Sequence, residues 1–536
     1  MRYKRLIAVS ILVFAFAGAW AQKYDPTVEV TKDFVSKMSD AQKVEVNTPL
    51  PDSLSRFNLK FDYEVFDKPY KGSYTFTPYN VMLIPDDNPL KRPFFYLNAG
   101  AGYGFHPELT AVISPRLGRK FTLDIYQDLG GYSGAYEGYS GRDISELAGV
   151  RGSLRMDSYD LLFDLHYNAL SVLDTVLTSG GYHRFGGNVR MSSSDMAANW
   201  MSYDVSASYN MAREMAGLSP LSEYEFLLYG TLAPSLQYEK LRFLLGFNTG
   251  YRGYSGAMDA TLYSIETVPQ FRFDLWKLHF NLGAKLSYLS RPSGHSMHFY
   301  PDMRLDLRLF KDRLDVFAGL SGGDRLNSYS SLKAENHHFT LANALGGQDD
   351  VLSCTRELYN AYLGLGGSVG SVFQYDIRAG HSKIADDTLL GADALGNATL
   401  VLGDYSLNYL DATTTVKTVP VEFNMGMHLR SADIDSAKAF SLPLLSSDAS
   451  LVWNWHRRLF VGAEFEMLSS RSMDTYTLDA FYRLGLSFEM KLCRWMSLWL
   501  KGDNLLNQRI ERIPGVVETG LGNGLWLSAG IRLGLR

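Results

Sequence analysis

Apolar and polar residues alternate strictly over many segments of this chain, which indicates β-strands with two different faces. In the segment FDLWKLHFNLGAKLSYLS (Phe273–Ser290), apolar side chains occupy every even position of Leu278–Tyr288. The odd positions between them include His279, Asn281 and Lys285. Residues two apart point to the same side of a strand, whereas a helix would distribute them around its axis. The pattern therefore predicts a strand with one apolar face and one polar face.

Such segments recur to the end of the chain, and some exceed the usual length of a strand in a soluble sheet. The alternation of Tyr476–Met490 is longer than the roughly ten residues at which most strands of globular proteins end. Short turns such as Trp276–Lys277 and His456–Arg458 alternate with longer stretches rich in Gly, Ser, Tyr and Asp, such as Gly130–Asp143 and Ser321–Asp350. These features predict an all-β, antiparallel outer-membrane barrel of about 22 strands, with its apolar face toward lipid and its polar face toward the lumen.

The N-terminus has the pattern of a secretory signal peptide. A basic segment, MRYKR, is followed by the apolar run LIAVSILVFAFAGA and by AWA before Gln22, which matches an A-x-A cleavage site. We therefore expect a signal peptide at 1–21, a periplasmic N-terminal arm at 22–93 and a transmembrane barrel at 94–536. The first strand is expected at Phe94–Gly104, and the short turns are expected in the periplasm, while the long loops are extracellular.

Composition excludes several other classes of function. The two cysteines, Cys354 and Cys493, are far apart, so neither a disulfide framework nor a zinc site with paired cysteines is supported. A net charge of −5 and a pI of about 6.1 do not favour a nucleic-acid partner. We expect no cofactor, no metal and no enzymatic activity. A weak alternative is an outer-membrane hydrolase, because Ser296 and His298 lie two apart on one face of a predicted strand.

Charged residues of both signs occupy positions predicted to face the lumen. Because the signs are interleaved on neighbouring strands, the pattern favours cross-strand ion pairs that hydrate and stiffen the wall, with a selective binding site as the alternative. The candidate lumen-facing residues are Lys285, Arg304, Asp306, Arg308, Glu464, Glu466 and Arg483.

The C-terminal segments MSLWLKGDNLLNQRIERIPG and GLWLSAGIRLGLR resemble the closing strands of TonB-dependent receptors. Asn504–Asn507 occupies the N-L-[FL]-[ND] segment of that family, and alternate apolar residues of Leu525–Leu535 form the lipid face of the last strand. The chain ends in Arg536 rather than in the aromatic residue usual for the family. The resemblance implies a receptor barrel that is inserted in the outer membrane by the barrel-assembly machinery, surrounded by its lipid, and engaged in transport.

The segment before the barrel departs from this family, because its members carry a large globular plug there. Only Gln22–Pro93 precedes the first predicted strand. Within it, the segment DPTVEVT (Asp25–Thr31) resembles the energy-coupling box of these receptors, which implies a periplasmic energy-coupling protein as partner. The candidate coupling residues are Asp25, Thr27, Val28, Val30 and Thr31. A wide barrel without a plug would be an open hole. We therefore expect one of three arrangements: outer loops fold inward, another chain fills the lumen, or the pore is gated in another way.

These observations favour a plugless receptor-like barrel that transports a solute across the outer membrane or acts as a channel. The alternative from another class is a non-transporting envelope scaffold whose N-terminal arm binds periplasmic partners.

Overall fold

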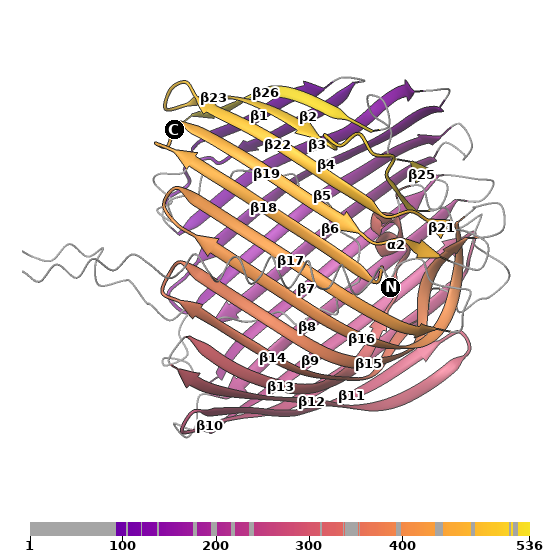
Figure 1. Ribbon diagram of the computed structural model, residues 1–536. Helices are drawn as coiled ribbons and strands as arrows, with labels where there is room; N and C mark the ends of the chain where they lie inside the picture. The colour runs from indigo at the N-terminus through magenta and orange to yellow at the C-terminus, as the bar shows by residue number, and fades with distance from the viewer. Residues whose placement is uncertain are drawn as a thin grey trace, which may run out of the picture. The chain divides into compact units, whose positions relative to one another are not determined.

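The described part of the chain is a closed antiparallel β-barrel of 22 strands (Figure 1). This computed structural model describes residues 93–102, 105–118, 120–136, 139–174, 180–193, 201–215, 220–234, 241–310, 313–335, 337, 352, 354–392, 398–434, 443–472, 477–513, 516–517 and 524–535. The expected signal peptide, nearly all of the expected arm and the candidate coupling residues Asp25–Thr31 lie outside these ranges.

The barrel strands follow one another around the barrel in chain order. They are β1 (Phe95–Gly102), β2 (His106–Ile113), β3 (Phe121–Tyr136), β4 (Tyr139–Arg155), β5 (Tyr159–Asp174), β6 (Gly180–Ser193), β7 (Met201–Glu214), β8 (Leu221–Pro234), β9 (Leu241–Gly256), β10 (Ala260–Leu275), β11 (Leu278–Arg291), β12 (Gly294–Phe310), β13 (Leu314–Leu326), β14 (Cys354–Val369), β15 (Phe373–Ala392), β16 (Ala398–Lys417), β17 (Val421–Ile434), β18 (Leu445–Trp455), β19 (Leu459–Leu468), β22 (Phe481–Lys491), β23 (Met496–Asp503) and β26 (Trp526–Leu535). Two small hairpins, β20 (Arg471–Ser472) with β21 (Thr477–Leu478) and β24 (Glu511–Ile513) with β25 (Val516–Val517), lie in connections, and the helix α2 (Tyr329–Glu335) follows β13.

Closure of the sheet joins its first and last strands. On one side of β1, Leu97 is paired with Ala111 of β2, and on the other side it is paired with Leu533 of β26. Both pairings are antiparallel, as are the others around the sheet, so the sheet has no unpaired edge. The predicted fold class and strand number are therefore confirmed.

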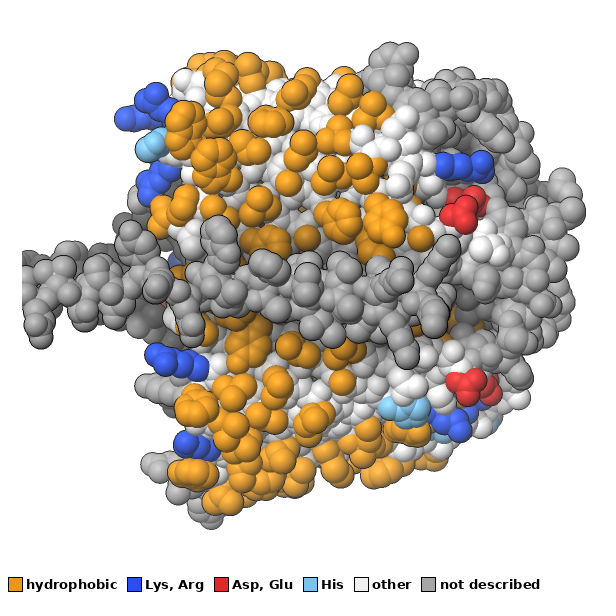
Figure 2. All heavy atoms as spheres, in the orientation of Figure 1, with side chains coloured by type: hydrophobic (Ala, Val, Ile, Leu, Met, Phe, Trp, Pro, Cys, Tyr) orange, Lys and Arg blue, Asp and Glu red, His pale blue; other side chains and the backbone are white. Residues whose placement is uncertain are grey.

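Apolar residues cover the outer face of the barrel, as the alternation predicts. In β11, Leu282 is 40% exposed and Leu286 is 50% exposed, whereas Ser287 and Leu289 on the opposite face are buried. Figure 2 shows hydrophobic side chains over the visible outer face of the strands. The even-numbered positions of Leu278–Tyr288 therefore form part of an apolar belt. Among the described residues, no helix combines the length and the apolar character needed to cross a membrane.

Two segments predicted as long outer loops are different in the structure. Within Gly130–Asp143, strands β3 and β4 continue as a paired hairpin up to the pair Tyr136 and Tyr139. Glycine and serine do not prevent extended backbone, and pairing along the hairpin satisfies its N–H and C=O groups. The second segment, Ser321–Asp350, begins as the end of β13 and continues into α2, whose side chains are largely buried.

Candidate functional site: a loop helix docked on the lumen wall

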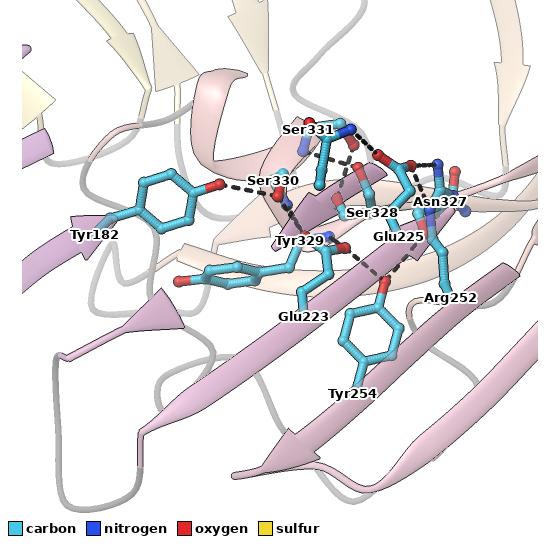
Figure 3. Close-up of polar contacts among 11 residues, drawn as sticks. Tyr182, Glu223, Glu225, Arg252, Tyr254, Asn327, Ser328, Tyr329, Ser330 and Ser331 are labelled. Carbon is cyan, nitrogen blue, oxygen red and sulfur yellow. Dashed lines mark hydrogen bonds and ion pairs between the residues drawn. The ribbon is translucent and has the colours of Figure 1, made fainter. Parts of the chain in front are cut away.

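The helix α2 packs against the lumen-facing side of four consecutive strands, β6 to β9. Each strand supplies one residue that makes polar contacts with the helix or with its flanking residues (Figure 3). The contacting residues are Tyr182 of β6, Glu214 of β7, Glu223 of β8 and Tyr254 of β9. Thus a segment between β13 and β14 occupies space inside the barrel, on the side of its wall formed by these strands.

The carboxylate of Glu223 holds the first turn of α2 in place. It accepts hydrogen bonds from the backbone N–H groups of Tyr329 and Ser330, each at 2.9 Å, and from the Ser330 hydroxyl. The Ser328 hydroxyl accepts a further bond from the N–H of Ser331 at 3.0 Å. The first N–H groups of a helix have no partner within the helix, and a negative charge near them is favourable. Glu223 and Ser328 therefore satisfy donors that would otherwise be buried without a partner.

Two tyrosines of the wall complete this contact. The Tyr254 hydroxyl donates to Glu223 Oε1 at 3.0 Å and also lies 3.2 Å from the carbonyl oxygen of Asn327. The Tyr182 hydroxyl donates to Ser330 Oγ at 2.9 Å. Figure 3 shows both tyrosines pointing from the wall toward the residues around the start of the helix. The start of α2 is thus fixed from three strands, β6, β8 and β9.

Glu214 provides a second buried anchor. Its Oε2 accepts a hydrogen bond from the Tyr329 hydroxyl at 2.9 Å and lies 3.1 Å from Lys333 Nζ. The side chains of Lys333 and Glu214 are each only 4% exposed, and burial lowers the pKa of the Lys333 ammonium below its usual value. Removing one partner of such a pair leaves an uncompensated buried charge, which is strongly destabilising. The pair therefore resists separation of α2 from β7.

Apolar side chains fill the space beneath the helix. Tyr329 and Leu332 of α2 pack in one buried cluster with Leu262 of β10, Leu289 of β11 and Cys354 of β14. These three strand residues point inward, where a lumen exposed to water would favour polar residues. In this cluster the inward-folded segment shields that part of the wall from solvent.

Asn327, two residues before the helix, binds two strands on the other side of the inserted segment. Its Nδ2 donates to Thr388 Oγ1 at 2.8 Å, and its Oδ1 accepts from Thr355 Oγ1 at 3.0 Å. Thr355 lies in β14 and Thr388 in β15, so α2 and the residue pair before it connect β6 to β9 with β14 and β15. The docked segment therefore braces strands that are distant around the sheet.

Several of the charged residues singled out in the sequence lie in ion pairs on the strands. Arg304 and Asp306 bind each other within β12, with Nη2 and Oδ1 2.9 Å apart, and the guanidinium also lies 4.7 Å from the ring centre of Phe317. Arg483 Nε donates to Asp503 Oδ1 at 2.8 Å and is paired in register with Glu466.

The remaining candidates have different surroundings. Lys285 is paired in register with Tyr300, and its Nζ lies near Gly323. Arg308 is exposed near the end of β12, and Glu464 Oε2 is buried without a hydrogen bond to any described residue.

The hydrolase alternative receives no geometric support. His298 Nδ1 lies 2.9 Å from Asp324 Oδ2, whereas Ser296 Oγ is buried and makes no hydrogen bond within the described part of the chain. A nucleophilic serine needs a base within hydrogen-bond reach, and the recorded contacts of His298 do not include Ser296. The described residues also contain no cluster of three or more His, Cys, Asp or Glu side chains that could hold a metal ion.

The docking residues of α2 were not singled out in the sequence, although one signal for them exists. Leu170, Leu262 and Leu289 are apolar residues at inward-facing positions near corresponding ends of their strands. In a water-filled barrel such positions would be polar, so several of them near one end of the strands indicate that something covers the wall there. The sequence does not say which segment covers it.

Comparisons with known proteins find the same fold in several solved structures, but no similar sequence. No family model and no curated protein sequence matches the chain. Among solved structures, the copper transporter OprC matches with a TM-score of 0.63 at 12% identity, over 82% of this chain and 80% of that one. The FrpB iron transporter of Neisseria meningitidis matches with a TM-score of 0.64 at 11% identity, over 83% and 81%.

A third match is the siderophore receptor PiuA of Acinetobacter baumannii, with a TM-score of 0.62 at 8% identity, over 82% of this chain and 81% of that one. At such low identity these similarities establish the fold. Together with the closed sheet of 22 strands, they confirm that the chain has the barrel fold of TonB-dependent receptors, as its C-terminal segments implied.

Proposed function

We propose that this protein moves a solute across the outer membrane through its barrel, and that the docked α2 segment narrows the passage in the resting state. The observation that carries the proposal is the helix bound inside a barrel of transporter fold by two buried carboxylates, Glu214 and Glu223. The solved structures with the same fold include transporters of copper and iron and a receptor for siderophores.

The wall on which α2 docks is suited to hold a movable segment. Its groups toward the helix are two carboxylates that accept and two tyrosine hydroxyls that donate hydrogen bonds. All four are carried by strands of the closed sheet, so the helix can leave and return without rebuilding the barrel. Ion pairs elsewhere on the wall, such as Arg252 with Glu225, lie within the sheet and remain when the helix leaves. Opening is then a local change confined to the inserted segment, and it has to break the buried contacts of Glu214 and Glu223.

Energy for transport would come from the periplasm through the N-terminal arm. The segment Asp25–Thr31, with Asp25, Thr27, Val28, Val30 and Thr31, would add as an extended strand to a coupling protein, because such pairing uses main-chain hydrogen bonds. The barrel would reside in the outer membrane, with the short turns in the periplasm and the opposite end at the cell surface.

Conductance in planar lipid bilayers tests this proposal. We expect purified wild-type protein to show low conductance, and a variant in which a short Gly–Ser linker replaces residues 328–353 to form large, steady channels. Both proteins should show the heat-resistant gel mobility of a folded barrel. A control linker inserted at Pro292, in the turn between β11 and β12, should leave conductance unchanged.

Equal conductance of the wild type and the linker variant would show that the segment does not restrict the lumen. Absence of conductance from both folded proteins would refute transport by this barrel alone and would favour the scaffold alternative.

A further inference from the structure

Two neighbouring short turns form a basic corner at the end of the barrel. The turn between β18 and β19 and the turn between β22 and β23 lie side by side, because the Lys491 N–H donates to the carbonyl oxygen of Arg458 at 2.8 Å. We define the basic corner as Arg457, Arg458 and Arg494. Figure 2 shows Lys and Arg side chains along the edge of the barrel at which Figure 1 marks the C-terminus. They lie beyond the apolar outer surface.

Among the described residues, no acidic side chain forms an ion pair with this corner. Arg457, Arg458 and Arg494 are exposed. The neighbouring Lys491 is not counted in the corner, because its ammonium lies 4.8 Å from the ring centre of Phe460, on the lumen-facing side of the strands. The arginines of the wall differ, since Arg304, Arg483 and Arg252 each bind a carboxylate. The corner is therefore available to an anion from outside the chain.

Aromatic side chains lie directly beside the corner. Trp455 precedes the first turn and is 51% exposed, and Trp495 follows the second turn and is 50% exposed. Tryptophan is enriched at the boundary between hydrocarbon and headgroups, where barrels carry aromatic girdles. These two side chains place the guanidinium groups of the corner at the depth of lipid headgroups.

The backbone of the first turn has an unusual conformation. His456 and Arg457 have φ values of 51° and 57°, in the left-handed region that favours asparagine or glycine in tight hairpin turns. The Asn454 side chain stabilises the turn by accepting a hydrogen bond from the Arg457 N–H at 2.8 Å. The turn thus carries a histidine and an arginine where small residues would be less strained, which indicates a use for the side chains themselves.

We propose that the basic corner binds the phosphate groups of anionic phospholipids in the periplasmic leaflet of the outer membrane. The proposal rests on the membrane location and topology of the proposed function. A lipid surface fits better than a soluble anion, because the charges adjoin exposed tryptophans and an apolar belt that are themselves in the membrane. Guanidinium groups bind phosphate oxygens with paired, charge-assisted hydrogen bonds.

A native cysteine provides a reporter for this contact. Cys493 is exposed in the second turn, next to Arg494, whereas Cys354 is buried and should remain unreacted in the folded barrel. We would attach a fluorophore to Cys493 of the full-length protein in phosphatidylcholine vesicles. Each vesicle sample would also contain the same small fraction of nitroxide-labelled phosphatidylglycerol or nitroxide-labelled phosphatidylcholine, and quenching by the two labelled lipids would be compared.

We expect phosphatidylglycerol to quench at least about threefold more strongly at low salt, since each basic residue near an anionic surface contributes about fivefold in binding. The ratio should fall toward one in about 1 M salt, where the screening length is about 3 Å. It should also fall toward one in the variant Arg457→Gln, Arg458→Gln, Arg494→Gln. The control Arg213→Gln changes an exposed arginine of β7 at the opposite end of the barrel. It should keep the wild-type ratio.

Equal quenching of the wild type by both lipids at low salt would overturn the proposal, as would a preference that persists in the triple variant. The salt series on the wild type decides the question if the triple variant does not fold. Absence of quenching by either lipid would instead contradict insertion in the membrane, so this failure of the proposed function is distinguishable from failure of the lipid contact.

Discussion

Replacing Glu223 with glutamine should release α2 from the wall without unfolding the barrel. In the wild type, one carboxylate oxygen accepts from the Tyr254 hydroxyl and the Tyr329 N–H, and the other accepts from the N–H and the hydroxyl of Ser330. In Glu223→Gln an NH2 group replaces one oxygen, so one backbone N–H of the helix would face another donor, while the hydroxyl bound to that oxygen can turn to accept from the NH2 group. At roughly 1–3 kcal/mol for a buried donor without an acceptor, the docked state should lose about 2 kcal/mol.

The reactivity of Cys354 measures this loss directly. Cys354 is fully buried in the same apolar cluster as Tyr329 and Leu332, so a maleimide reaches it when α2 leaves. In a Cys493→Ser background, Cys354 is the only remaining thiol of the chain. If opening is fast and reversible, the labelling rate follows the population of the open state. A loss of about 2 kcal/mol then raises the rate about thirtyfold.

The control for this experiment is Glu225→Gln on the same strand. Glu225 is also buried and faces the lumen, but its carboxylate binds Asn210 and Arg252 rather than α2. We expect much less change in Cys354 labelling from Glu225→Gln than from Glu223→Gln. An unchanged labelling rate in Glu223→Gln, with the barrel still heat-resistant, would refute the role of this carboxylate as the anchor of the helix.

Three further predictions concern the barrel and its N-terminal arm. Leu282→Arg should lower the free energy of unfolding in vesicles by roughly 2–4 kcal/mol, while Asn281→Arg should change it little; equal effects in urea titrations would contradict the outward direction of Leu282. An epitope tag at Pro292 should be stained on intact cells and one at Asp157 only after permeabilisation, and the reverse pattern would invert the topology. Deleting residues 22–50 should leave a heat-resistant barrel, and Val28→Pro should abolish uptake at unchanged barrel abundance, because proline removes a backbone donor from an added strand; uptake that survives Val28→Pro would exclude the coupling segment.

Strand formation in this protein could be predicted from sequence because its cause is local. Residues two apart share a face of a strand whatever lies elsewhere, so the alternation in Leu278–Tyr288 was enough to predict an apolar outer face. The same reasoning, with alternating short turns and longer connections, predicted a closed barrel of the strand number observed. It was wrong for Gly130–Asp143, because the composition of a hairpin does not determine where its pairing ends.

Only the tertiary structure decided what occupies the lumen. Glu214, Glu223 and Leu289 lie on three different strands, and their contacts with α2 depend on a segment that is distant from them in the chain. Alternation reports which side of a strand a residue faces, but it carries no information about what covers that side. The carboxylates of Glu214 and Glu223 could equally have faced water or paired along the wall. They anchor a helix because closure of the sheet brings β6 to β9 around the segment between β13 and β14.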